Sequence, residues 1–533
     1  MSCVPVRAAA CEENPIGPAD FGVEQFSVAA VLDRRAEQCP DRVMMSIDGV
    51  EVTFEQMRRR SHAAARALLD SGIGPGDGFA LFAATCPQWV YFWLGAGRIG
   101  AVAAAVNTAH KGEFLLHALR LARANVIVTD AERTSRVEEV AAELPGLVSI
   151  VVDDMSFDDD DGVPAVTDHV GAVDDIGSLF FTSGTTGASK AVATTWHYLF
   201  TTAATAAAAW EFAAGEALWT AMPLFHLSAA PAVLAPMLVG GTTVLASAFH
   251  PASVWDEVRD CAAVGFVGAG AMVSMLMNQP PGSGDAQLPL RFISAAPIAA
   301  SMYREIEKRY GCRIVTMYGL TEAFPIAVKG VADDGVPGTS GRPNPNFDVR
   351  IVDPDGAPLP DGTVGEIACR PRHPHVMSEG YLNASGEGLA PHPQWFRTGD
   401  LGTLDDHQNL TYVDRVKDSL RRRGENISSV EVETVVTRHP AVLEAAVVGV
   451  PSELGEDDIL LFVTVEPGTV LNYTELLDFC GARMPYFCVP RYVQIVGELP
   501  KTVIGRIRKD VLRAQGVGPT AWDRDSHGYI VSR

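Results

Sequence analysis

A strand followed by a glycine-containing loop near the middle of the chain constrains the fold more than any other stretch. Residues 179–181 are apolar and predict the end of a buried strand. Residues 182–189 are all small or hydroxylated, include two glycines, and lead directly to Lys190. Glycines allow the backbone to approach a ligand closely, successive N–H groups form an anion-binding nest, and Lys190 adds a positive charge. The stretch therefore predicts a loop that binds a polyphosphate.

The spacing of this loop differs from that of a Walker A motif. Only two residues separate Gly184 from Gly187, and Lys190 follows three residues later. A cluster of Gly, Ser and Thr between regular elements can also be an ordinary solvated loop. The loop alone does not decide between these interpretations, so the rest of the chain has to.

Length and charge limit the classes of protein to consider. A chain of 533 residues is too long for one hydrophobic core, so we expect two or more domains. Hydrophobic residues make up 47% of the chain, which is enough for a large core. The formal net charge is −23, from 65 acidic and 42 basic residues. This balance argues against nucleic acid or an anionic membrane as a partner, but not against a small anion in a locally positive pocket.

The cysteines and the longest uncharged stretch bear on the location of the protein. Nine cysteines are scattered without a C-x-x-C pair or a Cys/His metal spacing, so we interpret them as reduced thiols of a cytoplasmic protein. No long apolar run begins the chain, which indicates no signal peptide. Residues 217–255 carry no Asp, Glu, Lys or Arg, but prolines and a Gly-Gly pair interrupt them. We therefore predict a buried helix and strand there, and no membrane span.

The order of helical and strand patterns predicts the fold class. The two patterns alternate through residues 26–150 and again through residues 219–328. Strands separated by helices of this length predict parallel sheets with right-handed crossovers. Residues 341–370 instead show short strands with Asp-Gly turns, which predicts a β-subdomain. We predict an α/β protein with a large N-terminal domain, residues 1–414, and a smaller mobile α+β C-terminal domain, residues 415–533.

Four further clusters carry residues suited to a nucleotide. Residues 318–322 follow a predicted strand and offer an aromatic ring, a hydroxyl and a carboxylate that can hold Mg²⁺. Residues 395–400 end in a carboxylate at a turn, where it could bind a ribose diol. Residues 414–427 are densely charged around a glycine, and residues 500–506 are basic. Each cluster alone has an ordinary structural explanation, such as a turn or a solvated face, but five clusters in one order do not arise readily by chance.

Together these clusters resemble the adenylate-forming superfamily, which includes acyl-CoA synthetases, the adenylation domains of peptide synthetases, and luciferases. The resemblance covers residues 26–513 and is most specific at residues 181–190 and 318–322. Residues 106–108 and 112–114 look most like the crotonobetaine/carnitine-CoA ligase branch. The resemblance implies an ATP-dependent, AMP-forming ligase that uses Mg²⁺ and activates a small acid as its AMP adduct with release of pyrophosphate. In most such enzymes the acid is a carboxylate that is then transferred to CoA.

The resemblance also implies which residues bind the nucleotide. The residues that would wrap the ATP phosphates are Thr182, Ser183, Gly184, Thr185, Thr186, Gly187 and Lys190. Tyr318 would lie against adenine, Thr321 would contact the α-phosphate, and Glu322 would hold Mg²⁺. Asp400 would bind the ribose hydroxyls, with Arg415 beside them. Lys190, Thr321 and Glu322 would act in catalysis.

The same resemblance assigns the acid site and the moving parts. His226 would face the acid, and the residues that would border its pocket are Ser294, Ala295 and Ala296. The oxyanion of the acid would attack the α-phosphorus, with N–H groups, Mg²⁺ and a cationic side chain stabilising the negative charge. A nucleophile would then displace AMP. Lys417 would be the hinge about which the C-terminal domain rotates, exchanging the Arg506 loop for the loop at residues 424–426.

The sequence departs from the family at a catalytic position. Arg506 stands where the family has a lysine that bridges the acid and the α-phosphate, and the matching residues 500–505 fix the register. Arginine keeps the charge but is larger and planar. Three interpretations stay open: Arg506 does the same work on a differently shaped acid, Lys501 or Lys509 replaces it, or adenylation is impaired.

Two smaller departures lie near the phosphate loop. Ser189 stands where family members usually have proline, and Trp196 stands where they often have histidine. Each alone is compatible with neutral drift.

Three functions remain open at this point. The first is the commonest function in the family, in which a carboxylate is activated and its acyl group is transferred to CoA. The first alternative is an ATP-dependent diazotase that adenylates nitrite for attack by an arylamine. The second alternative is a degenerate nucleotide-binding homologue, which the intact Lys190, Glu322, Asp400 and Arg415 disfavour. Homodimers are common in the family, and the sequence neither supports nor excludes one here.

Overall fold

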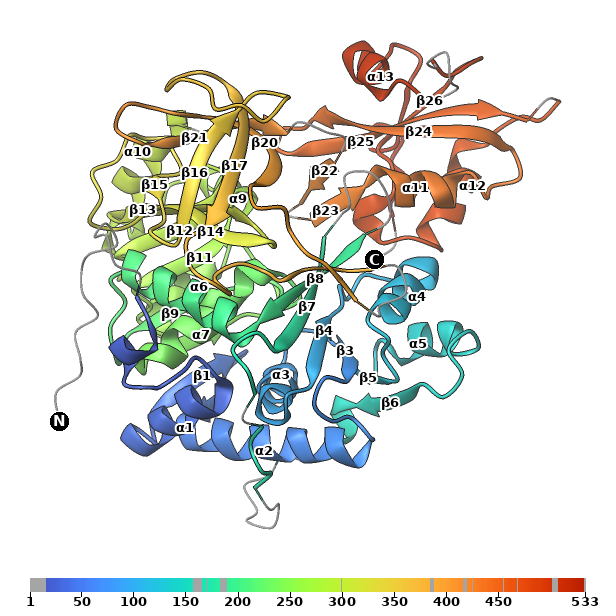
Figure 1. Ribbon diagram of the computed structural model, residues 1–533. Helices are drawn as coiled ribbons and strands as arrows, with labels where there is room; N and C mark the ends of the chain where they lie inside the picture. The colour runs from blue at the N-terminus through green and yellow to red at the C-terminus, as the bar shows by residue number, and fades with distance from the viewer. Residues whose placement is uncertain are drawn as a thin grey trace.

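The computed structural model describes residues 16–155, 157, 165–169, 171–182, 189–298, 300–383, 388–415, 419–423, 425–453, 455–466, 468–500 and 507–531. Figure 1 shows a large α/β part, a yellow β-subdomain above it, and a smaller orange-to-red part that lies over helices α4 and α5. The predicted α/β fold class, with a large N-terminal and a smaller C-terminal unit, is confirmed. The exact boundary after residue 414 stays a prediction.

The first large sheet has eight strands in the order β19-β18-β8-β7-β4-β3-β5-β6. Its strands are β3 (Gly78–Phe82), β4 (Val102–Ala105), β5 (Val126–Thr129), β6 (Val148–Val151), β7 (Ile176–Thr182), β8 (Lys190–Thr195), β18 (Gly380–Leu382) and β19 (Leu389–Ala390). Strands β7, β4, β3, β5 and β6 are parallel, as predicted, whereas β8, β18 and β19 continue the sheet antiparallel. The apolar run at residues 179–181 lies in β7, and β7 and β8 flank the phosphate loop as an antiparallel pair.

The second large sheet has nine strands in the order β15-β14-β13-β12-β11-β9-β10-β1-β2. Its strands are β1 (Val43–Ile47), β2 (Val50–Thr53), β9 (Ala217–Thr220), β10 (Thr242–Leu245), β11 (Gly265–Ala269), β12 (Phe292–Ala296), β13 (Arg313–Leu320), β14 (Ala323–Lys329) and β15 (Arg342–Pro343). The six central strands, β13, β12, β11, β9, β10 and β1, are parallel to one another. At the edges, β14 and β15 on one side and β2 on the other pair antiparallel with their neighbours. The parallel strands of both sheets thus end at edges where loops can build a site.

Helices α6 (Trp196–Ala209) and α7 (Ala230–Val239) lie between the two large sheets (Figure 1). Every residue of α7 is buried, as expected for a helix that is apolar all round. Thr202 of α6 donates to the carbonyl oxygen of Phe324 in the nine-stranded sheet, at 2.9 Å. On the other side, Cβ atoms placed at Gly97 and Gly177 would come within 2.8 Å of the Trp196 ring. Trp196, one of the departures from the family, therefore fits because two glycines make room for it.

The remaining helices of the N-terminal part cover the sheets. They are α1 (Val28–Gln38), α2 (Phe54–Asp70), α3 (Pro87–Ile99), α4 (Gly112–Leu121), α5 (Thr134–Ala141), α8 (Val254–Asp260), α9 (Gly270–Met277) and α10 (Ala300–Tyr310). Short 3₁₀ helices occur at Pro18–Phe21, Val152–Asp154, Leu227–Ala229, Asp285–Gln287 and Tyr486–Cys488. Among the described residues, no helix has the length and apolar character needed to cross a membrane. The helix and strand predicted within residues 217–255 are α7 and β10.

The β-subdomain and the C-terminal part follow in the chain. The subdomain is an antiparallel sheet of β16 (Phe347–Val352), β17 (Gly365–Pro371), β20 (Phe396–Leu404) and β21 (Leu410–Arg415). The C-terminal part contains the hairpin β22 (Ser419–Arg422) and β23 (Glu425–Ser428), helices α11 (Ser429–Val436), α12 (Tyr473–Gly481) and α13 (Lys509–Gln515), and strands β24 (Val442–Pro451), β25 (Asp457–Val465), β26 (Tyr492–Ile495) and β27 (Trp522–Asp523). The last four strands form one sheet in the order β24-β25-β26-β27.

The C-terminal part packs against helix α4 of the N-terminal part. Phe114 of α4 belongs to the hydrophobic cluster formed by α11, α12 and the strands around them. Arg438 pairs with Glu113 at 2.8 Å, and Lys111 donates to the carbonyl oxygen of Gly481. These contacts fix one orientation of the C-terminal part relative to the large sheets.

Enlarging a residue of α6 tests whether this helix is fully enclosed between the sheets. Ala204 is completely buried, so Ala204→Leu should lower the free energy of unfolding by about 1–3 kcal/mol through overpacking. Urea denaturation followed by circular dichroism measures the change. The matched control is Ala142→Leu at an exposed helix end, where we expect a change within about 0.5 kcal/mol. Equal effects of the two substitutions would contradict the buried position of α6.

Candidate active site

The pairing of β18 with β8 gathers a cation, a phenol and a carboxylate next to the phosphate loop. Tyr381 pairs with Val192, two residues after Lys190, and the Lys190 ammonium lies 4.5 Å from the centre of the Tyr381 ring. The Tyr381 hydroxyl donates to Oε1 of Glu322 at 2.7 Å. Glu322 is buried, with 7% of its surface exposed, and directly follows Thr321, whose carbonyl oxygen accepts from Tyr198 at 3.2 Å. Tyr381 therefore contacts both groups: its ring lies against Lys190, and its hydroxyl binds Glu322, the predicted metal ligand.

A second buried pair joins two other predicted nucleotide residues. Tyr318, near the end of β13, donates its hydroxyl to Oδ2 of Asp400 at 2.9 Å. Asp400 lies in β20, is 4% exposed, and its backbone N–H donates to the hydroxyl of Thr398. Arg415 is the register partner of Asp400 on β21. The structure therefore brings Tyr318, Asp400 and the backbone of Arg415 together, and their role in binding a nucleotide stays a prediction.

The residues predicted for the acid lie at one edge of the nine-stranded sheet. Strands β9, β11 and β12 are neighbours and parallel, so their carboxyl ends share this edge. His226 follows β9, and residues 294–296 end β12 opposite residues 267–269 of β11. Ser294 and Ala295 are buried, whereas Ala296 is partly exposed. A Cβ at Gly270 would lie 1.9 Å from the carbonyl oxygen of Pro297, so the two strand ends approach closely only because residue 270 is glycine.

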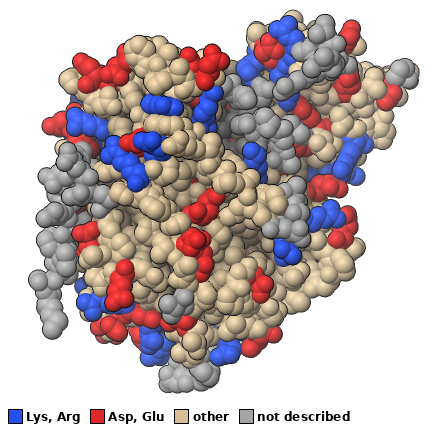
Figure 2. Space-filling model, viewed as in Figure 1, with Lys and Arg blue, Asp and Glu red and all other residues tan. Residues whose placement is uncertain are grey.

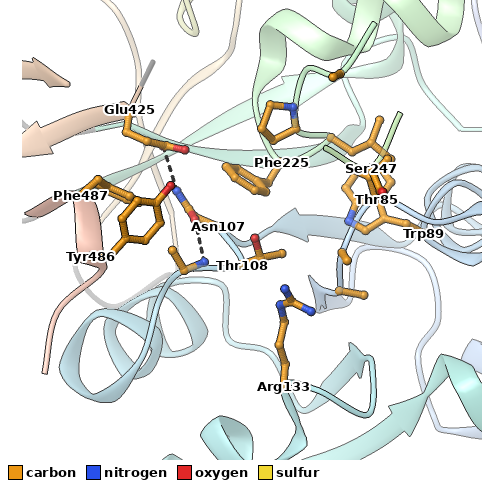
Figure 3. Close-up of a pocket in the computed structure, with 16 residues that line it drawn as sticks. Thr85, Trp89, Asn107, Thr108, Arg133, Phe225, Ser247, Glu425, Tyr486 and Phe487 are labelled. Carbon is orange, nitrogen blue, oxygen red and sulfur yellow. Dashed lines mark hydrogen bonds between the residues drawn. The ribbon is translucent and has the colours of Figure 1, made fainter. Parts of the chain in front are cut away.

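A cavity of about 220 Å³ lies between the sheets and the C-terminal part (Figure 3). From the eight-stranded sheet it is lined by Thr85, Asn107 and Arg133, which follow β3, β4 and β5. From the nine-stranded sheet it is lined by Phe225 and Ser247, which follow β9 and β10. The cavity therefore opens at the carboxyl ends of both parallel sheets, where α/β proteins bind ligands. Figure 3 shows the Arg133 guanidinium pointing into it.

Glu425 is the charged residue that the C-terminal part contributes to this cavity. Its Oε2 accepts from Nδ2 of Asn107 at 3.0 Å and lies 3.1 Å from Nε2 of His226. Tyr486 and Phe487 line the same side (Figure 3). The β22–β23 hairpin is held by the buried Arg422, which donates to Asp458 and to the carbonyl oxygen of Phe487, each at 3.0 Å. Arg422 thus fixes the hairpin that carries Glu425 to His226.

Burial sets the protonation of several side chains near these residues. Burial and the Glu322 carboxylate raise the pKa of the Tyr381 phenol well above its usual value, so Tyr381 stays a hydrogen-bond donor. Burial and nearby Lys190 lower the pKa of His392 to about 4. The His392 ring lies 5.2 Å from the Tyr381 ring, and its Nε2 is 2.7 Å from the Ser378 hydroxyl. On the visible face, acidic and basic residues are interspersed among uncharged ones, and some acidic residues lie near the centre of the view (Figure 2).

Some of the predicted site residues lie outside the described part of the chain. These are Ser183, Gly184, Thr185, Thr186, Gly187, Lys417 and Arg506. Of the phosphate loop, Thr182 and Lys190 are described, and they face each other as register partners on β7 and β8. Among the described residues, no group of three or more His, Cys, Asp or Glu could hold a metal ion by itself.

Sequence reasoning missed residues that complete the site. Tyr381 and His392 come from strands and loops far from the motifs, and Arg133 follows β5 in a stretch with no motif. A position just after a parallel strand is the one signal that could have pointed to Arg133. Tyr381 carries no comparable signal, because β18 has only three residues and pairs with a strand almost 190 residues earlier.

Comparison with known families identifies the class of protein. Residues 32–382 match the AMP-binding enzyme family, and residues 431–506 match the AMP-binding enzyme C-terminal domain. The chain belongs to the AMP-binding enzyme family, and it is an adenylate-forming ligase of the acyl-CoA synthetase type.

Individual relatives agree with this assignment. The chain is 28% identical to crotonobetaine/carnitine–CoA ligase of Salmonella typhimurium over 88% of this chain and 95% of the relative. It is 29% identical to the ligase of the same name from Escherichia coli O157:H7, over 86% of this chain and 93% of the relative. These similarities confirm the predicted resemblance to this branch. They do not favour the diazotase or the degenerate homologue, because the relatives are CoA ligases.

Solved structures share the fold. A double mutant of o-succinylbenzoate CoA synthetase from Bacillus subtilis, bound to a product analogue, matches with a TM-score of 0.80 at 23% identity, covering 91% of this chain and 98% of that one. The amide bond synthetase McbA from Marinactinospora thermotolerans matches with a TM-score of 0.79 at 26% identity, covering 91% and 99%. Both coverages show that the fold similarity extends over nearly the whole chain.

The low pKa of His392 predicts how stability depends on pH. The unfolded chain takes up a proton on this histidine near pH 6.5, whereas the folded protein does so only near pH 4. The free energy of unfolding should therefore decrease as the pH falls from 6.5 towards 4. His62 and His110, with pKa values lowered to about 4 by burial, act in the same direction.

His392→Asn isolates one of these contributions. Urea denaturation at pH 7 and pH 5 should show that the variant loses less stability than the parent, by about 2 kcal/mol at pH 5. The exposed His407, changed to Asn, serves as the control and should leave the pH dependence unaltered. An unchanged dependence in His392→Asn would contradict the buried, neutral state of this ring.

Proposed function

We propose that the protein activates a small carboxylic acid with ATP and transfers the acyl group to CoA. The observation that carries the first half is that β18 brings Lys190 and Glu322 to one tyrosine at the end of the phosphate loop. A cation for the phosphates and a carboxylate for their metal then lie on two sides of the same site. The similarity to crotonobetaine/carnitine–CoA ligases supports a carboxylate as the acid and CoA as the acceptor.

In the first half-reaction the acid's oxyanion attacks the α-phosphorus of ATP and pyrophosphate leaves. Lys190, with the loop N–H groups and hydroxyls, compensates the charge that develops on the phosphate oxygens. Thr321 donates its hydroxyl to the α-phosphate. Asp400 accepts from the ribose hydroxyls beside Arg415, and the hydrogen bond from the Tyr318 hydroxyl orients its carboxylate. His226 and residues 294–296 border the acid.

Glu322 fits the role of a Mg²⁺ ligand. Mg²⁺ in nucleotide sites is held by one or two carboxylates together with substrate phosphates and waters, so a single protein carboxylate is enough. Glu322 meets this requirement, because the Tyr381 hydroxyl orients it and it is next to Thr321. When bound, Mg²⁺ would neutralise charge on the phosphate oxygens.

In the second half-reaction the CoA thiol displaces AMP. The cavity between the domains supports this step, since it is lined by Glu425, which contacts His226, and by Arg133, whose guanidinium pairs with Asp130. We infer that the described orientation is the one for thiol transfer. The other orientation, reached by rotation at Lys417, brings Arg506 to the acid and the α-phosphate. The division into residues 1–414 and 415–533, a cytoplasmic location and a homodimer are further parts of this proposal.

The function is tested by pyrophosphate release with Mg²⁺ and a panel of aliphatic and aromatic carboxylates, with and without CoA. Release driven by one carboxylate, and thioester formed on adding CoA, supports the proposal. Nitrite with an arylamine forms a further arm, and release with nitrite alone would overturn the carboxylate assignment. An amine arm covers amide formation, since McbA is an amide bond synthetase. If the enzyme forms an amide without CoA, the assignment of CoA as the acceptor is overturned, whereas the activation of a carboxylate still holds.

Glu322→Gln tests the metal ligand in the first half-reaction. The amide keeps the size of the side chain and can still accept from Tyr381, but it lacks the charge that binds Mg²⁺. We expect pyrophosphate release to fall about 10²-fold or more. The matched control is Glu379→Gln, a neighbouring carboxylate that pairs with His375 at 2.7 Å and has no proposed role. A rate near that of the parent in Glu322→Gln would remove Glu322 from the site.

Glu425→Gln tests the second half-reaction separately. Neutralising Glu425 removes the charge next to His226, so thioester formation from preformed acyl-AMP should slow about tenfold. Pyrophosphate release should stay unchanged, because Glu425 acts only in the described orientation. Single-turnover mixing of acyl-AMP enzyme with CoA measures the effect, with the exposed Glu453→Gln as control. Equal loss in both half-reactions would contradict this division of labour.

A further inference from the structure

Ser189, the last residue before Lys190, is bonded to the C-terminal part. Its backbone N–H donates to Oε1 of Glu431 at 2.9 Å, and its hydroxyl donates to the same oxygen at 2.7 Å. Glu431 lies in the first turn of α11, and its own N–H donates to the helix cap Ser428. One carboxylate of the C-terminal part thus accepts two hydrogen bonds from the residue that ends the phosphate loop.

The N-terminal part holds the same residue from the other side. Nε2 of His117, on α4, lies 2.8 Å from the carbonyl oxygen of Ser189 and donates to it. Helix α4 is also the surface on which the C-terminal part packs, through Phe114 and the Glu113–Arg438 pair (Figure 1). Ser189 therefore bridges α4 and α11, next to the cation of the phosphate site.

The Glu431 carboxylate depends on these donors. Burial raises the pKa of Glu431, and the largest opposing influences are the two hydrogen bonds from Ser189. A partly buried carboxylate that loses its donors is strongly disfavoured. Proline, the residue common in the family at this position, has neither an N–H nor a hydroxyl and could make neither bond. The departure at Ser189 therefore provides a bond between domains that proline cannot form.

We propose that Ser189 and Glu431 form a latch that holds the C-terminal domain in the thiol-transfer orientation by attaching it to the end of the phosphate loop. Both are positioning residues. The latch rests on the proposed function, because it assumes that the domain rotates between two half-reactions. Rotation away from the described orientation has to break both hydrogen bonds, so the latch favours thioester formation and opposes the return to the orientation for adenylation.

The test separates the half-reactions in Ser189→Ala, Ser189→Pro and Glu431→Gln. Thioester formation from acyl-AMP should slow about tenfold in Glu431→Gln and Ser189→Pro, and less in Ser189→Ala, which keeps the N–H donor. Pyrophosphate release should stay constant or rise in Glu431→Gln, which leaves the phosphate loop unchanged. Ser189→Thr retains both donors and should restore thioester formation. The effects of Ser189→Ala and Glu431→Gln should not add in the double variant, because each removes part of the same interaction.

Hydrogen exchange gives a readout that does not require activity. In Ser189→Pro and Glu431→Gln, peptides of α4 and α11 should exchange faster, since the C-terminal domain leaves α4 more often. The control is Arg438→Ala, which breaks an exposed ion pair across the same interface and should change neither exchange nor the ratio of the half-reactions appreciably. Unchanged exchange in both latch variants, or equal losses in both half-reactions, would overturn the latch. Absence of pyrophosphate release in the parent with every acid would instead overturn the proposed function, and the exchange result would still decide on the latch.

Discussion

The antiparallel pairing of β18 with β8 is the contact on which the candidate site depends. It places the ring of Tyr381 next to the Lys190 ammonium and its hydroxyl on Glu322. Lys190 begins β8 of the eight-stranded sheet, whereas Glu322 follows β13 of the nine-stranded sheet, and Tyr381 contacts both side chains. A three-residue strand thereby connects the two halves of the N-terminal domain at the place where charge has to be compensated.

The local patterns of the sequence were sufficient for most of the fold. The apolar run before the phosphate loop became β7, the uncharged residues 217–255 contain the predicted helix and strand as α7 and β10, and the alternation of helices and strands became two largely parallel sheets. These predictions succeeded because the period of apolar residues reports burial within a single element. The position of Glu322 at the end of β13 could also be predicted, because carboxylates at such ends have few structural reasons to be there. Asp400 was predicted at a turn, and this was wrong, because it lies in the middle of β20, where Arg415 pairs with it.

The contacts that complete the site could not be predicted from the sequence in the same way. Tyr381 and Ser189 each act through a partner that is far away in the chain, with Ser189 and Glu431 separated by 242 residues. Their identities fit a turn or a strand equally well, so only the assembled sheets and the docked C-terminal part reveal their neighbours. Trp196 is a similar case, since its large ring fits only because positions 97 and 177, in two other elements, are glycines. Long-range packing, and not local preference, determines all three.

The two-residue strand β27 also affects how molecules of this protein behave toward one another. Trp522 and Asp523 pair with Val493 and Tyr492, and the Trp522 ring stacks on Tyr473 at 5.3 Å. Strand β26 would otherwise present unpaired N–H and C=O groups at the margin of the sheet, a template for strands of other chains. Because β27 is short and anchored by a stacked ring, it covers that margin without offering a long edge of its own. This part of the fold therefore guards against aggregation, independently of any chemistry at the nucleotide site.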